Sequence, residues 1–119
     1  MRSSTTIKLQ TYNCELVVTV VESVSLEAKR LYKKYKINDE FGSEAEGALI
    51  MPNSEKYYLL LNTSYLSHNT IAHEVFHAAV RVTEDRDITD EEAQAWLAGH
   101  LSGTIYKFLE KKKLQVKHG

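Results

Sequence analysis

The strongest constraint on the fold of this chain is a mainly apolar stretch, residues 67–82, that repeats with the period of a helix. One stripe, at intervals of three or four residues, is formed by Ile71, Val75, Ala78 and Val82. Further apolar residues, Phe76 among them, widen this stripe almost all round the helix. The pattern predicts a buried helix, yet the same stretch carries two histidines and a glutamate, whose burial without partners would cost several kcal/mol.

These polar residues form the motif H-E-x-x-H at His73, Glu74 and His77. Side chains at i and i+4 lie one above the other on a helix, with their Cβ atoms about 5–6 Å apart. Two imidazoles in these positions can share one zinc ion at the required ~2.0–2.1 Å. Glu74 lies one step round the helix, beside the ion, where it can take a proton from water. The spacing therefore predicts a zinc site with His73 and His77 as metal ligands and Glu74 as the catalytic general base.

A third protein ligand is expected for such a site. A histidine on a short tail is excluded because residues 78–82 do not continue the motif as x-x-G-x-x-H. Carboxylates stand at the start of the last predicted helix, where Glu92 shares a stripe with small and apolar residues that would allow close helix packing: Ala95, Trp96, Gly99 and Gly103. We expect Glu92 to be the third ligand, with Glu91 as second choice. The competing interpretation of Glu92 is a capping box with Thr89.

The pattern along the whole chain predicts one α+β domain over residues 1–119. We expect a small and mainly antiparallel sheet with three helices packed against it. Alternating or valine-rich segments predict four strands, at residues 7–12, 15–21, 48–51 and 56–62. Asn13 and Cys14 are expected in a hairpin turn, and residues 38–47 in a loop. Helical periodicity predicts one helix from an N-cap at Ser25 to about residue 37, and others at 67–82 and 90–112.

The composition bounds the partners and the compartment. The net charge is -1, from 15 basic and 16 acidic residues, so no overall basic field favours nucleic acid. The lysines at 111–113 are expected to be a solvated helix end. The single cysteine, Cys14, excludes an internal disulfide. No secretory signal follows Arg2 and the apolar runs are too short to cross a bilayer, so a cytoplasmic protein without a membrane partner is expected.

Three segments together resemble a known group of proteins: residues 57–62, 70–77 and 92–99. They resemble the small H-E-x-x-H metallopeptidase-like proteins of bacteriophages, which are similar to the ImmA/IrrE-type minimal gluzincins. The resemblance covers residues 46–106 and implies a phage protein acting in the host cytoplasm. It also implies a zincin core in which Glu92 completes the zinc site, with Ala95 at the family's spacing. The chain departs from the ImmA/IrrE pattern at Trp96, where an asparagine often stands, and lacks that group's Met-Pro helix ending and DNA-binding domain.

The function expected from these features is zinc-dependent hydrolysis of peptide bonds in a peptide or protein substrate. Three residues are candidates for stabilising the oxyanion: His100, Tyr65 and Tyr106. The substrate is expected to add as an extra strand to the edge of the hairpin at residues 48–62. The alternative is a non-catalytic binding or inhibitory phage protein that keeps zinc only to hold its fold.

Overall fold

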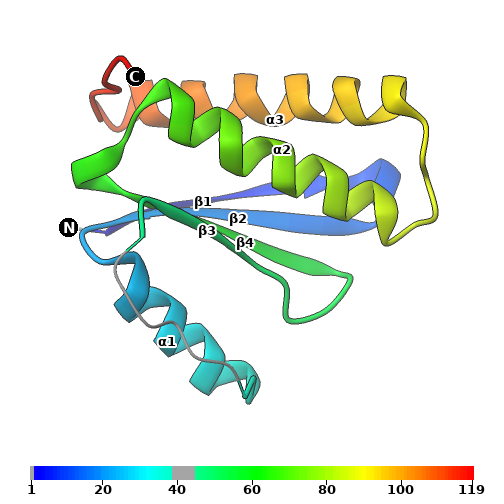
Figure 1. Cartoon of the computed structure of the whole chain (residues 1–119), viewed down its shortest axis with the longest axis horizontal. Coiled ribbons are helices and arrows are strands. Elements are labelled where there is room, and N and C mark those ends of the chain that lie inside the picture. The colour runs from blue at the N-terminus through cyan, green and yellow to red at the C-terminus, as the bar shows by residue number, and fades with distance from the viewer. Residues whose placement is uncertain (1, 39–44) are drawn as a thin grey trace.

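A computed structural model describes residues 2–38 and 45–119 and has an α+β architecture, with helices on both faces of a mixed sheet (Figure 1). The strands of this part are β1 (Arg2–Leu9), β2 (Cys14–Val21), β3 (Gly47–Ile50) and β4 (Lys56–Asn62). The helices are α1 (Val24–Tyr35), α2 (His68–Glu84) and α3 (Glu91–Lys111), with short 3-10 turns at Gln10–Tyr12 and Thr63–Tyr65. The predicted α+β class is thus confirmed.

The strand order in the sheet is β1-β2-β4-β3. The outer pairs, β1 with β2 and β3 with β4, are antiparallel, whereas the central pair of β2 and β4 is parallel. The sheet is therefore mixed: the two outer pairs are antiparallel, as predicted for most of the sheet, and the central pair is not. The parallel pair is possible because α1 carries the chain away from the end of β2 before it returns through β3.

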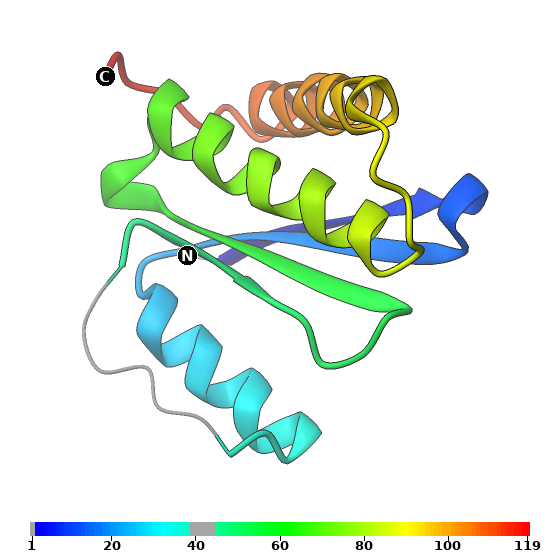
Figure 2. The ribbon, with the colours of Figure 1, turned by 45° about the vertical axis from the view of Figure 1, so that its right-hand side comes forward.

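The two faces of the sheet carry separate apolar cores. α2 and α3 lie side by side on one face, and α1 covers the other (Figures 1 and 2). Along β4 the side chains alternate between the two cores: Leu59 and Leu61 face α2 and α3, whereas Tyr58 and Leu60 face α1. Because β4 is central and covered on both faces, its residues form a continuous apolar run.

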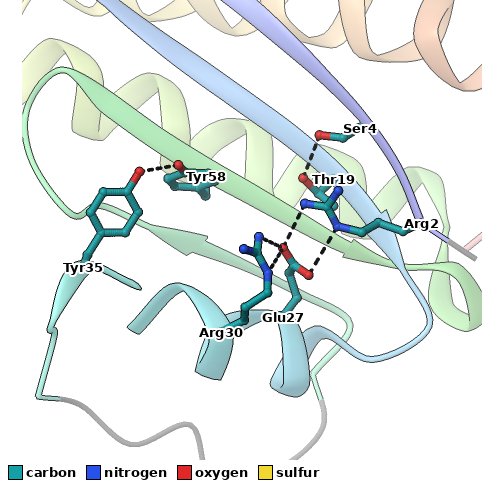
Figure 3. A network of polar contacts seen from close by, with 7 residues as sticks. All are labelled: Arg2, Ser4, Thr19, Glu27, Arg30, Tyr35 and Tyr58. Carbon is teal, nitrogen blue, oxygen red and sulfur yellow. Dashed lines mark hydrogen bonds and ion pairs between the residues drawn. The ribbon is translucent and has the colours of Figure 1, made fainter. Parts of the chain in front are cut away.

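A polar network holds α1 to the sheet (Figure 3). Glu27 of α1 is paired with Arg2 of β1 at 3.3 Å and with Arg30 at 2.5 Å. Burial raises the pKa of Glu27, but the hydrogen bonds from the two arginines outweigh it and bring this pKa below its ordinary value. Nearby, the hydroxyls of Tyr35 and Tyr58 are 2.5 Å apart. These contacts connect α1 to the outer strand β1 and to the inner strand β4.

Several predicted boundaries and caps are wrong. β1 spans Arg2–Leu9 rather than residues 7–12, because its antiparallel pairing with β2 continues to Val21. Residues 10–12 form a 3-10 turn that ends at Asn13, and Cys14 already belongs to β2. The N-cap of α1 is Ser23, whose hydroxyl accepts the N–H of Leu26, and Ser25 lies inside the helix. α3 starts where predicted, with Asp90 as the N-cap whose carboxylate accepts the N–H of Glu92, so the competing capping box with Thr89 is not formed. The loop predicted at residues 38–47 falls mostly outside the described residues.

The predicted burial of α2 on nearly all sides is also wrong. The stripe of Ile71, Val75, Ala78 and Val82 is buried, but Phe76 is 63% exposed. The sheet and α3 cover two sides of α2, and no further layer of the described chain covers its outward side. Within the same residues, no helix combines the length and the apolar character needed to span a bilayer.

Candidate functional site

The start of α2 is held by the C-terminal segment of the chain. At its start, Ser67 accepts the backbone N–H of Thr70, and the N–H groups of His68 and Asn69 donate to the carbonyls of Lys117 and Gly119. The first N–H groups of a helix have no partner inside the helix, so the C-terminal segment satisfies donors that would otherwise remain unpaired. This attachment fixes the position of the helix that carries the H-E-x-x-H motif.

The two histidines of the motif lie together on the outward side of α2. The Nε2 atoms of His73 and His77 are 3.2 Å apart, and the ring planes are inclined by 77°. Two nitrogens bound to one tetrahedral zinc at ~2.0–2.1 Å would be about 3.3 Å apart. The imidazole pair therefore has the spacing of two ligands to one ion, and both rings are exposed.

Glu74 points in a different direction, toward β3, and is only 6% exposed. Burial raises the pKa of its carboxyl group, and the neighbouring His73 and His77 counteract part of this effect. The buried carboxyl group is thus harder to ionise than one in water. Glu74 is thus a buried carboxyl group next to the imidazole pair.

Two hollows flank this group of side chains. One, of about 270 Å³, is lined by Leu49, Met51, His73, Glu74, His77 and Arg81. The other, of about 220 Å³, is lined by Glu46, Gly47, Asn69, Thr70, His73 and Glu74. His73 and Glu74 border both hollows, so the motif lies between them. The wall opposite α2 is β3, an edge strand of the sheet.

The structure does not bring Glu92 to the histidines. Glu92 is exposed and lines a different hollow, formed by α3 alone with Ala95, Trp96, Gly99 and His100. The stripe that was expected to pack closely faces solvent, with Trp96 78% exposed. α3 packs instead through larger apolar residues on its other side: Leu97, Leu101, Ile105 and Phe108. Burial of this larger apolar surface outweighs the advantage of close packing by small residues.

The second-choice ligand, Glu91, is exposed and lies along a groove between α2 and α3, where Phe76 and Ala79 face it. Across residues 2–38 and 45–119, no three His, Cys, Asp or Glu side chains are grouped so that they could hold a metal ion. The described residues therefore offer two imidazoles with the spacing of two ligands to one ion, and no third side chain is grouped with them as a ligand.

The three candidate oxyanion residues lie away from the two hollows. His100 lines the hollow on α3, and Tyr65 is half exposed in the turn after β4. The hydroxyl of Tyr106 is 2.7 Å from Nδ1 of His68, at the start of α2, and burial raises the pKa of this tyrosine. None of the three is among the residues that line the hollows beside His73.

Gly47 and Arg81 are among the lining residues of the site that were not predicted. Gly47 opens the strand that faces Glu74, and Arg81 lies one helical turn after His77. The sequence signal for Arg81 is its i+4 spacing from His77, which continues the line of the motif. For Gly47 the signal is a glycine at the start of an apolar run, a position where another group can approach the backbone closely.

Comparison of the chain with protein-family models, with curated proteins and with solved structures finds no match.

Proposed function

We propose that the protein is a zinc-dependent peptidase in which His73 and His77 hold the ion and Glu74 acts as general base. The observation that carries this proposal is the pair of exposed imidazoles with Nε2 atoms 3.2 Å apart, next to a carboxylate that is almost completely buried. The resemblance of the H-E-x-x-H segment to the phage-type minimal gluzincins supports the same reaction.

The chemistry divides between the ion and the chain. Zinc, when bound, activates water and polarises a carbonyl group. His73 and His77 serve as ligands in their neutral form, so metal binding is expected to weaken as the imidazoles become protonated. Glu74 takes a proton from the attacking water and returns it to the leaving amine.

The substrate is proposed to lie along β3. Among the described strands, β3 pairs only with β4, so one edge of β3 is open to a further strand. A peptide added at this edge gains backbone hydrogen bonds and presents alternate side chains to one face. Gly47 and Leu49 are two residues apart and lie on the same side of β3, the side that faces α2. A peptide paired with this edge of β3 would have a peptide bond near His73 and Glu74, and its side chains would enter the two hollows.

Metal analysis of the purified protein tests the zinc site. We expect about one zinc per chain in the wild type and little in His77→Ala, because one imidazole alone is a weak site. Glu92→Ala tests whether Glu92 also binds the ion. Loss of zinc in Glu92→Ala would mean that the start of α3 turns toward α2 when the ion is bound, and retention would leave the two histidines as the protein ligands. A wild type without zinc affinity would refute the proposal.

A second candidate function is a binding or inhibitory role in which zinc only supports the fold. The observation that favours it is the small size of the two hollows, below the ~300–1,000 Å³ that is usual for ligand sites. Glu74→Gln separates the two functions. A peptidase loses hydrolysis while its zinc content and fold remain, whereas a binding protein keeps its biological effect in this variant.

A further inference from the structure

Arg81 continues the line of the two histidines along α2. His73, His77 and Arg81 are spaced at i, i+4 and i+8, and all three line the larger hollow. The side chain of Arg81 is 53% exposed, and its guanidinium is 3.8 Å from the half-exposed carboxylate of Glu84. An exposed pair at this distance contributes little to stability, so the guanidinium can turn to a ligand at small cost.

The chemistry of this hollow fits an anion with a short apolar stem. Leu49 and Met51 form an apolar wall, and Arg81 adds a positive charge beside the proposed ion site. Glu74 also lines this hollow but is only 6% exposed, whereas the side chain of Arg81 is 53% exposed. Two positive charges next to each other repel unless a negative group lies between them. A guanidinium matches a carboxylate particularly well, because it can donate two parallel hydrogen bonds. The volume of about 270 Å³ suits a group of side-chain size rather than a large ligand.

We infer that this hollow is a carboxylate-binding subsite in which Arg81 selects the substrate. The inference rests on the proposed peptidase function. The carboxylate belongs either to an acidic side chain beside the scissile bond or to the C-terminus of the peptide. Glu74 lines both hollows, but the second has Glu46 and, among its described lining residues, no arginine; the Glu46 carboxylate accepts a hydrogen bond from Thr70 at 3.2 Å. A carboxylate is therefore drawn to one side of His73 and repelled from the other.

The test measures peptide binding to the metal-free protein by NMR, following the side-chain Nε–Hε signal of Arg81. The probes are acetyl-Ala-Ala-Glu-Ala-amide, its Gln and Lys counterparts, and the Gln peptide with a free C-terminus. We expect one of the two peptides with a carboxylate to bind about tenfold more tightly than the uncharged Gln amide, since a charged hydrogen bond is lost in the latter. The peptide that binds identifies the source of the carboxylate.

Variants decide whether Arg81 is responsible. Arg81→Gln should abolish the preference, and Arg81→Glu should reverse it in favour of the Lys peptide. Lys107 is exposed on α3, so Lys107→Glu makes the same change of charge there and should leave the preference unchanged. Equal binding of all peptides to the wild type, no measurable binding of any, or a preference unaffected by Arg81→Glu would overturn the inference. A zinc titration of the same samples tests the proposed function separately. A peptide preference without zinc affinity would support the carboxylate-binding subsite and refute the peptidase function.

Discussion

The side chain of Glu74 lies directly over Gly47, in the space where any other residue would carry its Cβ atom. A Cβ built on residue 47 would be 2.8 Å from Cγ of Glu74, 3.1 Å from Oε2 and 3.1 Å from the carbonyl oxygen of Leu60. The first of these distances is too short for two carbon atoms, and the carbonyl belongs to the paired strand β4 and cannot move easily. The glycine therefore determines where the proposed general base can lie.

Replacement of Gly47 by alanine should displace Glu74 while leaving the histidines in place. We expect Gly47→Ala to lower kcat at least tenfold with an unchanged zinc content, and to cost about 1–3 kcal/mol of stability through overpacking. Steady-state kinetics, metal analysis and urea unfolding measure the three quantities. Gly99→Ala is the matched control, because no atom lies within 4 Å of its added Cβ. This control should gain about 0.5–1 kcal/mol from helix propensity, and an active Gly47→Ala enzyme would refute the positioning role.

Zinc should stabilise the folded protein through the two histidines. At a free zinc concentration of 100 times Kd, binding adds about 2.7 kcal/mol, so Tm should rise by roughly 10 °C. His73→Ala and His77→Ala should remove this shift, as thermal unfolding with and without a chelator will show. His100→Ala is the control, because His100 lines a different hollow on α3. If His100→Ala removed the zinc-dependent shift as completely, the ion site would not be the one proposed.

Acid should weaken the attachment of α1. The pKa of Glu27 is lower in the folded protein than its ordinary value, because Arg30 and Arg2 outweigh the effect of burial. Stability from this group is therefore present above the unfolded pKa, about 4.3, and is lost as the pH falls through the lower folded pKa. Glu27→Gln should cost about 1–2 kcal/mol at pH 7 and much less at pH 2–3. Urea unfolding at both pH values, with the exposed Glu110→Gln as control, measures this, and an equal cost at both would contradict the ion-pair account.

A hydrogen-bonded network at the far end of α2 should contribute to stability but not to metal binding. The hydroxyl of Tyr57 donates to Asp85 at 2.5 Å and accepts from Arg86 at 2.9 Å, while Arg86 also donates to the carbonyls of Tyr12 and Ser54. Burial, with the hydrogen bond to Asp85, raises the pKa of Tyr57 to about 12. Tyr57→Phe should cost about 1–2 kcal/mol of unfolding free energy.

The zinc content of Tyr57→Phe should equal that of the wild type, because Tyr57 lines neither hollow beside the motif. Urea unfolding and metal analysis of the same preparation measure both quantities. A variant with unchanged stability would show that the network does not hold the end of α2, and a loss of zinc would show that it acts on the site.

The sequence alone determined the features that depend on local pattern. The period of the apolar residues located α2 and α3 to within a few positions, and valine-rich and alternating segments located β2, β3 and β4 but only the end of β1. The H-E-x-x-H spacing brought His73 and His77 together because i and i+4 are neighbours on any helix. These relationships involve residues close in the chain, so the helix itself fixes their distance.

Only the tertiary structure decided which faces meet. The small-residue stripe of α3 was a plausible packing surface, but the larger apolar residues around Leu101 bury more surface and turn Glu92 toward solvent. The parallel pairing of β2 with β4 and the contact of Gly47 with Glu74 join segments far apart in the chain. Local periodicity does not contain such long-range contacts, because they arise from the competition among all apolar faces of the chain for burial.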